Sequence, residues 1–261
     1  MVPPHPNPLP AGEREGPRKA WEGEGERFSE ERAVLLKHVF APIHADGWRF
    51  IAIFAVATLI FFWIWAPLGW LGVIATAWCI YFFRDPWRVS PQREGLVLSP
   101  ADGTIIAVDE AAPPAELQLG TEPMRRIAIF MSVFDVHVNR TPMAGKVARL
   151  AYTEGKFLNA SLDKASVDNE RMAMALTTAD GDIGVVQIAG LVARRIVTTL
   201  REGQEVIAGQ RMGLIRFGSR AEVYLPRGWA TLVTTGQRAV GGETVLADAR
   251  SVEPLRQWAE H

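Results

Sequence analysis

The chain has 261 residues, a formal net charge of −1 and 48% hydrophobic residues, so it can bury a substantial core. It has no cluster of lysine and arginine of the kind that follows a phosphate backbone, which excludes nucleic acid as a partner. The single cysteine, Cys79, excludes an internal disulfide and fits a reducing, cytoplasmic setting.

Residues 1–32 are rich in proline, glycine and glutamate and show neither helical nor strand periodicity. A segment of this composition cannot bury enough apolar surface to offset the entropy lost on ordering. The sequence therefore predicts a disordered leader, to which we assign no function.

An uncharged, strongly apolar run extends from Phe50 to Phe83 and is interrupted by Pro67 and Gly69. Each half has about 16 to 17 residues, the short limit for a helix that crosses ~30 Å of hydrocarbon. The pattern predicts two helices with a bend at Pro67 to Gly69, within a membrane-associated helical segment at 33–90. A buried helical pair in a soluble core is the alternative, but so long an uncharged run is rare there. Whether the hairpin spans the bilayer or stays in one leaflet is left open.

Both ends of this run are basic, with Arg49 before it and Arg84 and Arg88 after it. The positive-inside tendency favours a hairpin that returns to the cytoplasmic face of the cell membrane. Tryptophans, which favour the boundary between lipid and water, crowd the same region: Trp48, Trp63, Trp65, Trp70, Trp78 and Trp87. A lipid bilayer is therefore an expected partner.

From Gly95 onward the pattern changes to short β-type runs separated by turn signals, which predicts a mainly β, barrel- or sandwich-like domain at 95–250 and a C-terminal tail at 251–261. One strand is expected on each side of Ser219. The other expected strands are 96–98, 104–108, 126–133, 146–153, 172–177, 184–188 and 192–199. The sequence contains no glycine-rich phosphate loop and no zinc-type cluster of cysteine and histidine, and no metal is expected.

Ser219 follows Gly218 where the two flanking strands meet, so the serine is expected on a bend. Its hydroxyl can attack the carbonyl of Gly218, because glycine has no Cβ to block the approach. This is a route to self-cleavage between residues 218 and 219. Most Gly-Ser pairs are ordinary turns, so the assignment depends on partner residues.

Two stretches supply candidate partners. Asp102 stands on the turn of Ser-Pro-Ala-Asp-Gly at 99–103, directly after a strand. In Asp-Val-His-Val-Asn-Arg at 135–140, strand alternation would place Asp135, His137 and Asn139 on one face. A single aspartate or histidine in such a place is more often structural than catalytic. His137 is, however, the only histidine of the β domain, and an imidazole is suited to act as a base near neutral pH.

These motifs, with a C-terminal Gly-Ser and a short β tail, occur in this order behind an apolar N-terminal segment. The combination resembles the phosphatidylserine decarboxylases, specifically their short branch. The stretches at 155–160 and 168–171 are also similar to that family's pattern. The resemblance covers about residues 40–250.

The resemblance implies that Ser219 cleaves the chain at the Gly218–Ser219 bond, with His137 as the base and Asp102 orienting and charge-balancing the imidazole. Cleavage of this proenzyme would give a heterodimer of a large β subunit, residues 1–218, and a small α subunit, residues 219–261. Ser219 would become a covalent pyruvoyl group (pyruvate), the only cofactor implied. Its Schiff base with phosphatidylserine would release CO2 and yield phosphatidylethanolamine, which makes the chain a lyase of phospholipid biosynthesis.

The phosphate of such a substrate is expected to meet a basic group, for which Arg140, Lys146, Lys156 and Arg171 are unranked candidates. A membrane-anchored lipoyl- or biotinyl-type carrier or adaptor is an alternative function, because Lys164 stands in an Asp-Lys-Ala sequence like the modified tip of those domains. That hypothesis leaves the three motifs unexplained. A membrane-anchored scaffold without chemistry is the third hypothesis.

Overall fold

The computed structural model describes residues 41–155, 169–190, 195–216 and 219–253, together with 256, 258 and 259. The predicted leader at 1–32, Lys156, Lys164 and Gly218 lie outside the described residues. The helices are α2 (Gly47–Ile64), α3 (Ala66–Phe82) and the short 3₁₀ helix η1 (Ala115–Leu117). The strands are β1 (Leu96–Leu98), β2 (Gly103–Ala111), β3 (Met124–Met131), β4 (Val138–Arg140), β5 (Gly145–Thr153), β6 (Arg171–Thr178), β7 (Gly181–Ala189), β8 (Ile196–Thr198), β9 (Glu205–Val206), β10 (Arg211–Ile215), β11 (Ser219–Leu225), β12 (Ala230–Thr231), β13 (Arg238–Ala239) and β14 (Val245–Asp248).

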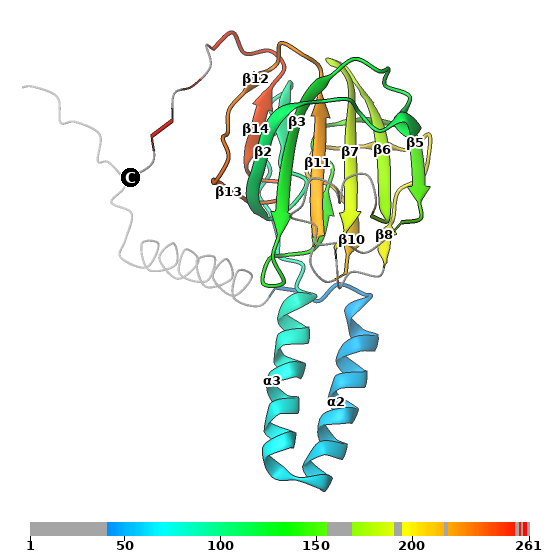
Figure 1. Ribbon diagram of the computed structural model, residues 1–261, viewed down its shortest axis with the longest axis vertical. Coiled ribbons are helices and arrows are strands. Elements are labelled where there is room, and N and C mark those ends of the chain that lie inside the picture. Colours follow the sequence, from blue (N-terminus) through cyan, green and yellow to red (C-terminus); the bar gives the residue numbers. More distant parts are fainter. Residues whose placement is uncertain are drawn as a thin grey trace, which may run out of the picture. The chain divides into compact units, whose positions relative to one another are not determined.

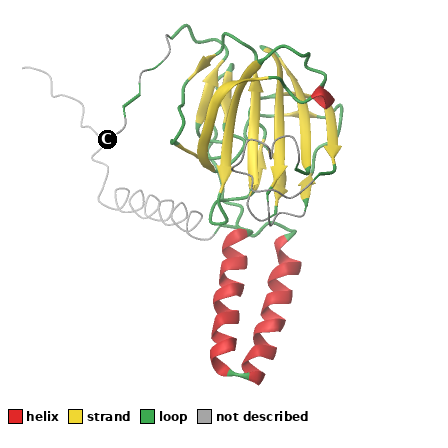
Figure 2. Cartoon of the chain, viewed as in Figure 1, coloured by secondary structure: helices red, strands yellow, loops and turns green. Residues whose placement is uncertain are grey.

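Among the described residues, the β domain is built on one curled antiparallel sheet with the strand order β13-β2-β3-β11-β7-β6-β5-β9 (Figure 1). Two smaller sheets, β1-β14-β12 and β4-β10-β8, complete it. Apolar side chains of all three sheets form the main core, for example Ile129, Val223, Leu246 and Ile215. The mainly β, half-barrel architecture with an N-terminal apolar helix pair confirms the fold class expected from the sequence (Figure 2).

The expected strands are present within the described residues, where the strand expected at 192–199 is described only as β8. The structure corrects the interpretation of residues 132–137. Strand β3 ends at Met131, and the amide of Asp135 donates to the carbonyl of Ser132 at 2.9 Å, which closes a turn. Strand β4 begins only at Val138. The expectation that Asp135, His137 and Asn139 share one strand face is therefore wrong, since strand alternation does not extend through a turn.

The helix pair forms as expected, but its bend lies earlier than predicted. Trp65 has the extended conformation (φ −164°, ψ 125°) that separates the helices, and Pro67 lies in the first turn of α3. Proline is tolerated there because the first helical amides need no partner within the helix. Pro67 therefore starts the second helix instead of forming the bend.

The two helices approach closely where small residues lie between them. A Cβ on Gly72 would lie 2.7 Å from Thr58 Oγ1, so only glycine fits there without displacement. The hydroxyls of Thr58 and Thr76 are 3.0 Å apart across the pair, so one can donate to the other, and each also lies within hydrogen-bond distance of a carbonyl of its own helix. Small residues and hydroxyl bonds of this kind are typical of helix pairs in lipid, where apolar burial alone gives no preference for a helix neighbour.

Most of the apolar surface of α2 is not covered by protein. By length and composition α2 is able to cross a membrane, and only 11% of its apolar window is buried. Exposed tryptophans lie at both ends of the pair, with Trp48 at the start of α2 and Trp63 near its end, about 22 Å apart along the helix. An exposed apolar hairpin with aromatic residues at each end is the arrangement expected of a membrane-associated segment.

The end of α3 belongs to the core of the β domain. Phe82 and Phe83 are fully buried and pack with Val136, Val138 and Leu214 in one apolar cluster. Apolar packing therefore joins the membrane segment expected at 33–90 to the catalytic domain expected at 95–250.

We predict that Phe82→Ala destabilises the β domain by about 3–5 kcal/mol, because it leaves a cavity at the base of α3. Phe62→Ala, near the far end of the hairpin where the ring is 38% exposed, is the matched control and should cost much less. Thermal unfolding in detergent measures both. Equal losses in the two variants would show that the base of α3 is not part of the domain core.

Candidate active site

Ser219 is the first residue of the central strand β11 and is fully buried. It pairs with Met131 of β3 on one side and Ala189 of β7 on the other. Its side chain lies on the core face of the sheet, where Oγ is 3.7 Å from Met131 Sδ. Sheet pairing on both sides fixes the position of this hydroxyl and shields it from bulk water.

Two buried amides lie on the same face. Gln187, opposite Ala221 in the sheet, donates from Nε2 to Asn139 Oδ1 at 2.7 Å. Asn139 Nδ2 lies 3.5 Å from Met131 Sδ, the sulfur that also contacts Ser219. Gln187 Oε1 is buried without a hydrogen-bond donor from the described part of the chain. The site therefore offers one open acceptor to a group that brings a donor.

The imidazole of His137 is buried beside the base of α3. Its ring centroid is 4.3 Å from that of Phe82, and its Nδ1 is 3.0 Å from the backbone oxygen of Asp135. Because a carbonyl oxygen only accepts, this bond places the proton of the neutral ring on Nδ1 and the basic lone pair on Nε2. The backbone oxygen of His137 accepts from the amide of Ile215, four residues before Ser219, which connects the histidine to the strand before the serine.

Burial lowers the pKa of His137 to about 4, against an ordinary value of 6.5. The positive charge of Arg84 acts in the same direction, while the bond to Asp135 opposes it. The imidazole is therefore neutral at physiological pH and can accept a proton.

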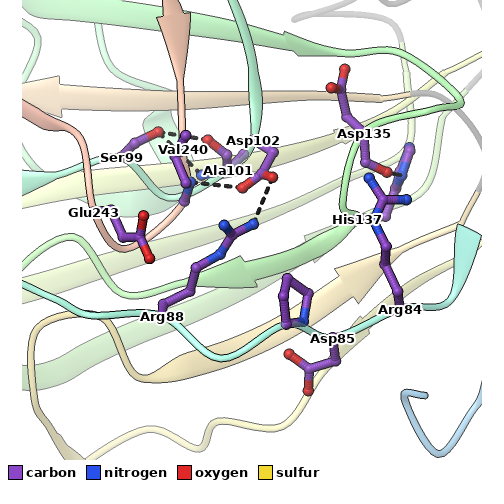
Figure 3. A network of polar contacts seen from close by, with 12 residues as sticks. Arg84, Asp85, Arg88, Ser99, Ala101, Asp102, Asp135, His137, Val240 and Glu243 are labelled. Carbon is purple, nitrogen blue, oxygen red and sulfur yellow. Dashed lines mark hydrogen bonds and ion pairs between the residues drawn. The ribbon is translucent and has the colours of Figure 1, made fainter. Parts of the chain in front are cut away.

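Asp102 lies on the turn before β2, as expected, and its carboxylate has two described partners. It accepts from Arg88 Nη2 at 2.7 Å and from the amide of Gly241 at 2.8 Å (Figure 3). Burial raises the pKa of Asp102, and the charge of Arg88 offsets this only in part. Both bonds hold the carboxylate at the turn before β2, and the orienting role predicted for Asp102 toward His137 stays a prediction.

Asp135 supports the turn that carries His137. Its carboxylate accepts from Arg238 and from the amide of Ser132, the latter at 2.7 Å. Burial acts to raise the pKa of Asp135, but these hydrogen bonds outweigh burial and the pKa is lowered. The carboxylate therefore stays charged near neutral pH and holds the turn between β3 and β4.

Comparison with known proteins decides the family. A family model for phosphatidylserine decarboxylase matches residues 75–247. A phosphatidylserine decarboxylase proenzyme of Cereibacter sphaeroides is 58% identical over 226 residues, which are 86% of this chain and 97% of that protein. A second such proenzyme, from Paramagnetospirillum magneticum, is 55% identical over 234 residues, which are 89% of this chain and 98% of that protein. The chain belongs to the phosphatidylserine decarboxylase family.

Membership of the phosphatidylserine decarboxylase family confirms the resemblance seen in the sequence and makes the chain a carboxy-lyase. The roles of Ser219, His137 and Asp102 stay predictions. Sequence reasoning did not identify Arg88, Gln187 or Arg238 as neighbours of the site. The one local signal was the position of Arg88 five residues after the end of the apolar run at Phe83.

The low pKa of His137 gives a pH prediction. The rate of self-cleavage should stay level from about pH 8 to about pH 5 and fall as the pH approaches 4, because protonation removes the lone pair of the base. Precursor made by cell-free translation, moved into buffers of different pH and followed on gels, gives the rate. An inflection near 6.5 would contradict the prediction.

A control must separate loss of the base from loss of the fold. The folded chain resists protonating His137 until about pH 4, whereas the unfolded chain takes up that proton near 6.5, so the free energy of unfolding declines as the pH falls between these values. Tryptophan fluorescence of the Ser219→Ala precursor at each pH shows where the chain is still folded. Only those pH values enter the comparison.

Proposed function

We propose that this chain decarboxylates phosphatidylserine to phosphatidylethanolamine, using a pyruvoyl group that it makes from its own Ser219. The observation that carries the proposal is the burial of Ser219 at the head of the central strand, with its hydroxyl on the core face and fixed by pairing on both sides. Family membership gives this hydroxyl its expected chemistry.

Self-cleavage begins when a base takes the proton of Ser219 Oγ and the oxygen attacks the carbonyl carbon of residue 218. The C–N bond breaks, an ester forms, and the proton goes to the freed amine. Removal of the Cα proton of residue 219 then expels the carboxylate of residue 218 and leaves dehydroalanine, which takes up water, loses ammonia and becomes the pyruvoyl group. His137, neutral and with its basic lone pair on Nε2, is the proposed base.

The surroundings of Ser219 favour elimination over hydrolysis of the ester. Ser219, Met131, Ala189 and Ala221 are all without solvent exposure. Water that reached the ester would restore a serine at the new N-terminus and give an inactive enzyme. Exclusion of water at this point is therefore part of the chemistry.

The residues around Ser219 also fit a pyruvoyl group and an amino-acid substrate. A pyruvoyl carbonyl at the head of β11 supplies the electron sink that loss of CO2 from an amino acid requires. The open acceptor Gln187 Oε1 suits the N–H of a substrate amine, and Asn139 holds the Gln187 amide in place. No external cofactor is needed for this chemistry.

The same proposal places the enzyme at the cytoplasmic face of the cell membrane, with its large β and small α cleavage products held together as a heterodimer. The pairing of β11 with β3 and β7 supports association after cleavage, because these hydrogen bonds join residues on either side of the cut. The exposed apolar hairpin and the basic residues at its base support insertion from the cytoplasm. The carrier hypothesis is not favoured by the family assignment.

We predict that Ser219→Ala yields a folded, full-length and inactive chain, since the attacking oxygen and the source of the pyruvoyl group are both removed. The wild-type protein should give two fragments, residues 1–218 and 219–261, the smaller with a blocked N-terminus. Denaturing gels and intact mass measure this. Two fragments from the alanine variant would refute the assignment of Ser219.

We predict that His137→Ala slows self-cleavage by about 10²–10⁴-fold, the usual contribution of a general base. Asp102→Asn should have a smaller effect, because the one oxygen that asparagine keeps can still accept from the amide of Gly241, although the second acceptor, which Arg88 uses, is lost. Thr199→Ala, an exposed residue after β8, is the control. If His137→Ala and Asp102→Asn both cleave at the wild-type rate, neither residue takes part in self-cleavage.

A further inference from the structure

An arginine-lined surface cavity lies between the start of α2 and strand β8. It has a volume of about 320 Å³ and is lined by Asp46, Arg49, Arg195, Ile196, Val197, Thr198 and Arg216. Among these described residues, three guanidinium groups face one carboxylate, so the cavity has an excess of positive charge. We call it the arginine cavity.

The guanidinium of Arg216 carries an N–H donor for which the described residues supply no acceptor. Its Nη2 is 3.6 Å from Asp46 Oδ1, which is an ion pair but longer than a hydrogen bond. Its Nε is buried and has no acceptor among the described residues. The guanidinium also lies over the ring of Phe50, 5.1 Å from the centroid, which holds it at the cavity wall. A buried donor on a cation suits an anionic oxygen.

The position of the arginine cavity indicates which kind of anion it would bind. Asp46 precedes the apolar helix α2 and Arg49 lies in its first turn, at the end of α2 that joins the β domain (Figure 1). Both residues line the cavity, so it stands where the hairpin leaves the β domain. Lipid head groups lie at this level if the hairpin enters a bilayer. Arg216 is three residues before Ser219, a distance of at most about 10 Å along the chain.

The basic residues that the sequence suggested for the phosphate are less suitable. Arg140 bonds the carbonyl of Gly209 at 2.9 Å and pairs with Asp85, and Arg171 pairs with Glu116. Lys146 is on β5, three strands away from β11 in the sheet order. Lys156 lies outside the described residues.

We propose that the arginine cavity binds the phosphodiester of a glycerophospholipid, through Arg195, Arg216 and Arg49. If the bound lipid is the substrate, this proposal rests on the proposed function. In phosphatidylserine one methylene and one oxygen separate the phosphate from the reacting Cα. The same chemistry is offered by the phosphodiester of a neighbouring anionic lipid, and the experiment separates the two sources.

The first measurement uses the uncleaved Ser219→Ala protein in uncharged detergent, so that it does not depend on self-cleavage or on decarboxylation. Short-chain phosphatidylglycerol should raise the melting temperature, and a short-chain diacylglycerol without phosphate should not. Arg195→Gln and Arg216→Gln should each weaken the apparent affinity by about tenfold, the usual loss for a charged hydrogen bond. Arg201→Gln, an exposed arginine in the loop after β8, is the matched control and should behave as the parent.

The second measurement uses the self-cleaved protein with dissolved short-chain phosphatidylserine. A rise in KM of about tenfold in Arg195→Gln, with kcat retained and competitive inhibition by short-chain phosphatidylglycerol, identifies the substrate's own phosphate. An unchanged KM with loss of the phosphatidylglycerol effect identifies a neighbouring lipid. Arg195 is exposed, so its variant tests the cavity even if Arg216→Gln does not fold.

Two results overturn the proposal. The first is an unchanged affinity for phosphatidylglycerol together with an unchanged KM in both arginine variants. The second is an equal stabilisation by inorganic phosphate, which would assign the cavity to free anions instead of lipid. Failure of the wild-type chain to cleave would refute the proposed function alone, since the first measurement uses an uncleaved protein.

Discussion

The position of Ser219 depends on backbone pairing at the head of β11. Hydrogen bonding to β3 and β7 fixes the strand on both sides, and strand alternation then directs the serine toward the core and Arg220 toward the opposite face. A shift of one residue in register would exchange these faces and remove the hydroxyl from the site. The large sheet is therefore the framework that gives one serine a fixed position away from bulk solvent.

The opposite face of β11 explains how a charged residue can follow the serine directly. Arg220 is fully buried and pairs with Glu222 at 2.7 Å, and Glu222 also accepts from the hydroxyl of Tyr224 at 2.7 Å. Burial, with the nearby charge of Glu222, raises the pKa of Tyr224, so its hydroxyl stays protonated and can donate. Pairing offsets the cost of burying these charges, and strand alternation keeps the cation away from the reacting oxygen.

Membrane segment and site share one packed region at the base of α3. Phe82 contacts both the apolar side chains near β4 and the ring of His137, and Arg84 donates to the carbonyl of Phe134 at 2.8 Å in the turn before the histidine. Burial by these aromatic rings also lowers the pKa of the imidazole. The structure thus connects the position of the hairpin to the protonation state of the proposed base. Apolar packing at the base of α3 therefore holds the exposed hairpin next to the candidate active site.

The sequence by itself determined the apolar hairpin, most strands of the β domain and the chemical character of Ser219, His137 and Asp102, because periodicity and short motifs are local properties of the chain. The tertiary structure decided which residues meet. Strand β3 ends at Met131, so His137 follows a turn. Asp102 bonds Arg88, and Gln187 bonds Asn139, 48 positions away. The tertiary structure also packed Phe82 against apolar side chains of the β domain and gathered Arg49, Arg195 and Arg216 around one cavity. Such contacts depend on how antiparallel strands pair and how helices pack on them, and residue spacing along the chain does not specify either.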